Sequence, residues 1–203
     1  MTTTTLITTA QKYFPKLQVI EKPNSKLMKL IAAVMFFNRG FMTSFDTTIG
    51  DTVYVPSMAW LDQNLPVLIH ETVHMYDEKR IGGLWYNLGY LFPQLLAMLL
   101  LPLFLFTHWY IALPLVILFA LPLPALWRAN FEKRAYLVQL YIYVNHYHFT
   151  EAVASASLTQ YFKDGTYYFM KPWQGALTLA EANALLASDT KLTTMVNDLV
   201  AAI

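Results

Sequence analysis

The feature that most limits how this chain can fold is a run of 47 residues, 81–127, without a single Asp, Glu, Lys or Arg. About 20 apolar residues cross a bilayer as a helix, so the run is long enough for two crossings. It predicts two helical arms, Leu84–Phe106 and Ile111–Trp127, joined by a turn at "THWY". Five prolines in the run would kink both arms. The alternative is a proline-broken helical hairpin that is buried in the protein or in an assembly.

The residues around this run predict its orientation. Lys79 and Arg80 precede it, Arg128, Lys133 and Arg134 follow it, and the central turn has no charge. Cations favour the cytoplasmic side of a membrane, so both ends of the hairpin, and the active site with them, are expected there. The N-terminal residues lack the basic and apolar regions of a secretory signal, which agrees with this location.

Composition and net charge limit the kinds of partner and metal ligand that this chain can be expected to have. Charged residues make up 13% of the 203 residues, against about 25% in a typical soluble domain, which favours a membrane or a large buried surface. The net charge of +1 gives no reason to expect nucleic acid as a partner. Cysteine is absent, so disulfides and thiolate metal ligands are excluded and any metal must be held by His and carboxylates.

Outside the run, the pattern predicts an α+β fold that is mostly helical, with a small N-terminal sheet. Residues 1–80 and 128–203 are expected to form one domain, into which 81–127 is inserted. Strands are expected near 16–21 and on both sides of the Gly50-Asp51 turn, and helices near 4–13, 25–37, 65–80, 128–149 and 151–162. Thr178 and Asp189 are expected to cap two short C-terminal helices.

The expected helix before the run contains His70-Glu71-Thr72-Val73-His74. Residues four apart lie on one helical face, so both imidazoles can reach one metal ion. Glu71 could then remove a proton from a water molecule that a zinc ion has acidified. The pattern thus predicts a zinc hydrolase site. Two alternatives are a pair of surface histidines without a metal and an inactive remnant of a metal site.

A catalytic zinc ion needs a third protein ligand. The best candidate is Glu132, which opens the helix after the apolar run and should return to the motif helix if both hairpin ends lie on one side. Asp77 is better placed to orient an imidazole than to bind the ion. His146 lies 14 residues beyond Glu132, roughly 21 Å along a helix, too far to share its ion. His146 and Tyr136 remain candidates for stabilising an oxyanion.

These elements resemble the gluzincin metallopeptidases in their minimal form. In that clan an edge strand ahead of the motif binds extended peptide, and the resemblance gives this role to Thr52, Val53, Tyr54 and Val55 in "TTIGDTVYVP". The apolar hairpin between the motif and the glutamate further resembles the membrane heat-shock and CAAX-prenyl proteases. There the glutamate opens Glu-x-x-Ala-Asp; here Glu132 and Ala135 match, but Tyr136 replaces the aspartate.

The resemblance implies a membrane-associated, zinc-dependent peptidase with one zinc ion per chain. His70, His74 and Glu132 would hold the ion, and Glu71 would be catalytic. An alternative is a phage virion or membrane assembly protein built on the same scaffold. A third is a membrane-binding module in which the histidines are incidental. The expected partners are a peptide substrate and either a bilayer or a protein assembly covering 84–127. A second copy of the chain is a further candidate partner.

Overall fold

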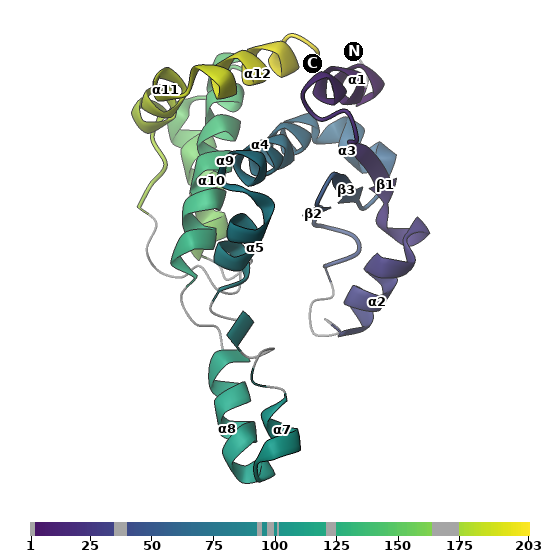
Figure 1. The fold of residues 1–203 in the computed structure, drawn as a ribbon. Coiled ribbons are helices and arrows are strands. Elements are labelled where there is room, and N and C mark those ends of the chain that lie inside the picture. The colour runs from purple at the N-terminus through teal and green to yellow at the C-terminus, as the bar shows by residue number, and fades with distance from the viewer. Residues whose placement is uncertain are drawn as a thin grey trace.

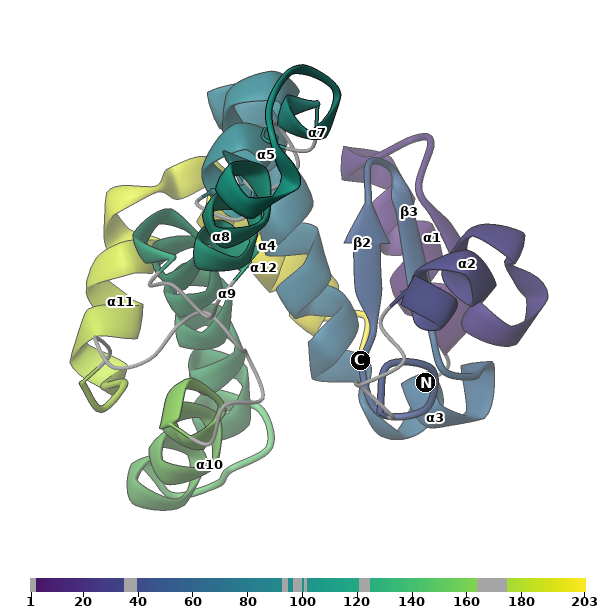
Figure 2. The same cartoon turned by 90° about the horizontal axis from the view of Figure 1, so that it is seen from below.

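The computed structural model describes residues 3–34, 40–92, 95–96, 100, 102–120, 125–163 and 175–203. The fold is α+β and mostly helical with one small sheet, as the sequence predicts. Helix α4 (Leu65–Ile81) runs through the middle, between the sheet on one side and the helices that follow the apolar run on the other (Figure 1). Figure 2 shows the same arrangement from below.

The sheet contains β1 (Gln18–Glu21), β2 (Thr47–Ile49) and β3 (Thr52–Val55) in the order β1-β3-β2. Strand β3 pairs in parallel with β1 and antiparallel with β2. The prediction that Thr52–Val55 is an edge strand is therefore wrong. Both edges of β3 are occupied. After β1, η1 (Lys22–Asn24) and α2 (Lys26–Val34) connect the chain to β2 at the opposite edge of the sheet, so that β3 lies between β1 and β2. The edge that faces α4 is β2 (Figure 2).

Helix α4 follows the short helix α3 (Met58–Gln63), which the sequence analysis did not predict and which Ser57 caps. Pro66 lies in the first turn of α4, where its missing N–H is not needed. Gly82 stops the helix with φ of 96°, a conformation that favours glycine. Ten of its 17 residues are buried, because other elements cover it on several sides.

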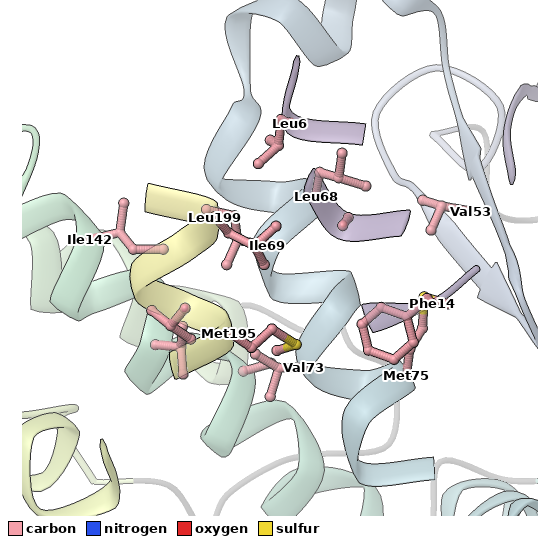
Figure 3. Packing of buried hydrophobic residues seen from close by; sticks show 14 of the residues in the cluster. Leu6, Phe14, Val53, Leu68, Ile69, Val73, Met75, Ile142, Met195 and Leu199 are labelled. Atoms are coloured by element: carbon pink, nitrogen blue, oxygen red, sulfur yellow. The ribbon is translucent and has the colours of Figure 1, made fainter. Parts of the chain in front are cut away.

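The main core forms where α4 meets α1 (Thr3–Tyr13), β3 and the C-terminal helix α12 (Thr190–Val200). Figure 3 shows this packing, with Leu6 of α1, Val73 of α4 and Leu199 of α12 among the labelled side chains. The C-terminal segment is thus part of the central domain. Thr178 and Asp189 cap α11 (Leu179–Ser188) and α12, which confirms both predicted caps.

Helix α9 (Leu126–Asn145) packs against α4 over a long contact and carries α10 (Glu151–Lys163) and α11 on its other side. It begins two residues before the predicted start at 128, so Trp127 belongs to α9 and not to an arm of the apolar run. The small second core lies between α9, α10 and α11 and includes Leu140, Leu158 and Ala182.

The apolar run contains α5 (Gly83–Leu91), α7 (Leu103–Phe106) and α8 (Trp109–Ala120). Helix α5 packs against α4 and α9 as part of the body, whereas α7 and α8 lie side by side and project away from it (Figure 1). Parts of both predicted arms, including residues 93–94, 97–99 and 121–124, lie outside the described residues. In the described parts of the chain, no helix is both long enough and apolar enough to span a bilayer.

Candidate metal centre

Helix α4 places His70, Glu71 and His74 in the interior, each less than 10% exposed. The Nε2 atoms of the two histidines lie 3.1 Å apart, and their rings meet edge to face. This follows from their spacing, since residues four apart stack on one helical face. Ligand atoms of all three residues lie within 4.8 Å of one another, so this buried group could hold a metal ion.

Glu132 of α9 reaches the same point from the opposite helix and is 1% exposed. Its Oε2 atom lies 3.3 Å from His70 Nε2 and 3.4 Å from His74 Nε2. Burial alone would raise the pKa of this carboxyl, but the two histidines outweigh burial and hold its pKa well below the ordinary value. Likewise, burial lowers the pKa of His74, and the Glu132 carboxylate outweighs that effect and raises it.

Two tyrosines of α5 complete the surroundings of these groups. The Tyr86 hydroxyl lies 3.1 Å from His74 Nδ1, and Tyr90 donates a 2.6 Å hydrogen bond to Glu132 Oε1. Burial, and then the Glu132 carboxylate, raises the pKa of both phenols, so they remain protonated. Sequence reasoning missed both residues because it assigned α5 to the hairpin. The available signal was their four-residue spacing directly after the Gly82-Gly83 stop.

Glu71 points toward the sheet. Its Oε2 accepts a hydrogen bond from Thr48 of β2, while Oε1 is 4.0 Å from His70 Nε2. Burial raises the pKa of Glu71 well above its ordinary value, and the nearby Asp46 carboxyl raises it further. Asp46 and Thr48 were also missed, because no local pattern shows that the loop before β2 returns to α4.

The other predicted residues lie in different surroundings. Tyr136, one turn after Glu132, packs its ring edge against His70 with 4.5 Å between ring centroids. Asp77 does not contact an imidazole: its Oδ2 accepts a 2.9 Å hydrogen bond from Arg134 of α9. His146 is the C-cap of α9, so the unbroken helix keeps it about 21 Å from Glu132.

A cavity of about 290 Å³ opens beside these groups. Its walls come from the 41–50 segment and from α4, α5 and α9. The lining residues are Phe41, Phe45, Asp46, Thr47, Thr48, Gly50, Glu71, His74, Glu78, Tyr86, Asn87, Tyr90 and Glu132. We call this cavity the central pocket. It gives a small molecule or a side chain access to His74, Glu71 and Glu132.

Lys22 binds the backbone of Phe41, a residue that lines the central pocket. This fully buried side chain donates a 2.7 Å hydrogen bond to the Phe41 carbonyl and lies over the Phe41 ring. Burial lowers the pKa of its ammonium group to about 8, while Asp46 and Glu71 act in the opposite direction. Lys22 therefore fixes the segment that carries Phe41, Phe45 and Asp46.

Compared with known protein families, with curated proteins and with solved structures, the chain matches none of them.

Proposed function

We propose that the protein is a zinc-dependent peptidase in which His70, His74 and Glu132 hold the metal ion. The observation that carries this proposal is the triangle formed by His70 Nε2, His74 Nε2 and Glu132 Oε2, with sides of 3.1, 3.3 and 3.4 Å. Ligand atoms of a tetrahedral zinc site, with bonds of about 2.0–2.1 Å, lie about 3.3 Å apart. The donor set of two imidazoles and a carboxylate also suits zinc.

Glu71 is a poorer third ligand than Glu132. Its nearest carboxylate oxygen is 4.0 Å from His70 Nε2, whereas Glu132 Oε2 is within 3.4 Å of both imidazole nitrogens. We therefore assign Glu132 as the metal ligand and Glu71 as the general base. Tyr86 and Tyr90 support the ligand roles of His74 and Glu132. Imidazoles and carboxylates that bind a metal commonly form a second hydrogen bond through the atom that does not face the ion.

The proposed reaction is hydrolysis of a peptide bond. A bound zinc ion supplies Lewis acidity, which lowers the pKa of coordinated water toward about 7. Glu71 accepts a proton from the attacking water and delivers it to the departing amide nitrogen. Burial raises the pKa of Glu71 above its ordinary value, and a raised pKa favours the proton-accepting step. Thr48 holds the other Glu71 oxygen and orients the carboxyl.

The substrate would bind along β2, in place of the predicted Thr52–Val55. Strand β2 pairs with β3 through one edge only and carries Thr48, which contacts Glu71. An extended peptide can add to such an edge through main-chain hydrogen bonds. This arrangement would bring a peptide bond to the central pocket.

Metal analysis tests the proposal directly. Protein purified without chelators should contain about one zinc ion per chain by inductively coupled plasma mass spectrometry. Glu71→Gln should keep the metal and lose peptide hydrolysis, whereas Glu132→Ala should lose both. Glu151→Gln, a substitution on α10 away from the centre, is the matched control. Metal-free protein after gentle purification contradicts the proposal.

We further propose that the peptidase works at a membrane, because the projecting α7–α8 hairpin exposes large apolar side chains. Leu105, Phe106 and Trp109 are 82%, 84% and 67% exposed. Exposed apolar surface of this kind marks contact with lipid or protein. In a flotation assay with phosphatidylcholine and phosphatidylglycerol vesicles, the protein should be found with the vesicles in the top fraction. The double variant Phe106→Asp, Trp109→Asp should remain in the bottom fraction. Leu30→Asp, at a 63% exposed position of α2, is the control.

The same exposed hairpin also favours a second candidate function, an assembly protein of a virion or membrane. In that case the hairpin would be covered by other protein chains. The protein should then form complexes of fixed stoichiometry without lipid, and these should survive Glu71→Gln. Light scattering of the purified chain with and without vesicles separates the two functions.

A further inference from the structure

The charged residues that line the central pocket are all acidic. Asp46, Glu71, Glu78 and Glu132 line it, and no Lys or Arg is among its described lining residues. None of these four carboxylates forms an ion pair with a lysine or arginine within the described parts of the chain. Glu132 is paired instead with His70 and His74, and Glu71 lies 4.0 Å from His70, so Asp46 and Glu78 are the lining carboxylates without an ion pair among the described residues.

Two acidic residues outside the pocket, by contrast, form ion pairs with cations of α9. Asp77 pairs with Arg134 at 2.9 Å, and Glu181 pairs with Lys133 at 2.7 Å. Both cations project from α9, the helix that also carries Glu132 into the pocket. Two cations of α9 are therefore paired outside the central pocket, while a third, Arg128, lies over the ring of the lining residue Tyr90, 4.8 Å from its centroid.

A metal ion does not change the position of Glu78. A zinc ion would offset the charge of Glu132, and Asp46 and Glu71 interact with each other, because burial and then Asp46 raise the pKa of Glu71. Lys22 compensates Asp46 only through space, because its Nζ atom is bound to the Phe41 carbonyl. Glu78 has no such cation, and it is the clearer candidate for a contact with substrate.

Glu78 is held in a defined position on the pocket wall. It lies one turn after His74 on α4, and its Oε1 accepts a 3.1 Å hydrogen bond from Asn87 of α5. The other oxygen remains able to accept a hydrogen bond. Phe45, also on the lining and only half-buried, offers an aromatic surface in the same pocket. A long cationic side chain needs both features, an apolar wall for its methylene groups and an anion for its tip.

We propose that the site selects peptides with a lysine or arginine side chain next to the bond that is cleaved, and that Glu78 is the counter-charge for this side chain. The inference rests on the proposed peptidase function. It gives Glu78 a role in specificity that is separate from metal binding and from proton transfer. It also predicts that acidic peptides are excluded, because a like charge in the pocket would be repelled.

The test compares fluorogenic peptides that differ only at one position beside the cleaved bond, with arginine, lysine, norleucine or glutamate. For the zinc-loaded protein, kcat/KM for arginine and lysine should exceed that for norleucine about two- to fivefold, the worth of one partly hydrated charge pair. The glutamate peptide should be the poorest. Glu78→Gln should remove most of the arginine preference, Glu78→Lys should favour the glutamate peptide, and Glu151→Gln should keep the wild-type order.

Binding to the Glu71→Gln variant, measured by fluorescence anisotropy, gives a readout that does not need turnover. The arginine peptide should bind more tightly than the norleucine peptide, and added salt should weaken the difference. Robust cleavage without a preference for arginine overturns the specificity proposal and leaves the peptidase function standing. Zinc-free protein that cleaves nothing overturns the peptidase function. Equal binding of both peptides overturns the role of Glu78 in either case.

Discussion

Tyr90 of α5 donates a 2.6 Å hydrogen bond to Glu132 Oε1, while the other oxygen of the same carboxylate faces His70 and His74. The two oxygens therefore have separate partners, and the rotation of the carboxylate is fixed by a residue from the apolar run. In a metal site, a ligand that is held in this way binds without first losing rotational freedom.

Tyr90→Phe should accordingly weaken metal binding without abolishing it. The change removes only the hydroxyl group, and loss of one supporting hydrogen bond typically lowers metal affinity about 10- to 100-fold. Competition with a fluorescent zinc chelator measures the affinity. Tyr110→Phe, on the exposed hairpin, should have no effect. Unchanged affinity in Tyr90→Phe would show that packing alone positions Glu132.

Asp77→Asn should destabilise the fold and leave the metal affinity nearly unchanged. The Asp77 carboxylate is fully buried and pairs with Arg134, which is 23% exposed. Because Arg134 keeps some contact with water, the loss should be about 2–3 kcal/mol, below the range for fully buried pairs. Urea denaturation measures the free energy of unfolding, and chelator competition measures the metal. Loss of zinc binding at unchanged stability would restore the predicted role of Asp77 in orienting an imidazole.

The parts of the centre that follow from local periodicity were predictable from the sequence. His70, Glu71 and His74 share one helix, so their spacing alone determines which of them face one another. Thr178 and Asp189 could be identified as caps because capping depends on only a few neighbouring residues. These inferences need no knowledge of tertiary packing.

Of the parts that depend on tertiary packing, the approach of Glu132 to the histidines could be predicted because the apolar run suggested a hairpin that returns the chain, and the others could not. Helix α5 lies in the same uncharged run as α7 and α8, and only its contacts with α4 and α9 show that it belongs to the body. Strand order in the sheet is likewise decided by β1, which joins β3 from more than 25 residues away in the sequence. Asp46 reaches Glu71 through the path of a loop, which has no periodic pattern to reveal it.

Lys22→Met should change how stability depends on pH. Burial lowers the pKa of Lys22 to about 8, from an ordinary value of 10.5 in the unfolded chain. Between these values the unfolded state binds more protons than the folded state, so the wild-type protein should gain stability as pH rises from 8 toward 10. Below pH 8 both states are protonated and this contribution is flat.

Denaturation of both proteins at pH 7.5, 9 and 10 tests this expectation. The difference in unfolding free energy, wild type minus Lys22→Met, should rise across the series. Measurements stop at pH 10, where tyrosines are about half ionised in the unfolded chain, and this contribution is common to both proteins and cancels in the difference. A difference that stays constant with pH would mean that Lys22 is solvated in the folded protein and does not anchor Phe41 as a buried cation.

Leu199→Ala should destabilise the whole domain, although only four residues follow Leu199 in the sequence. Its side chain is fully buried in the main core, where α12 meets α1 and α4 (Figure 3). Removing a leucine side chain from such a core costs about 3–5 kcal/mol through lost burial and the cavity left behind. Because α4 carries His70 and His74, zinc should protect both the wild type and the variant against unfolding if it binds at the proposed site. Thermal denaturation with and without zinc measures both effects, and Val153→Ala, at a 62% exposed position, is the control. A loss below about 1 kcal/mol would indicate that α12 is only loosely attached to α4.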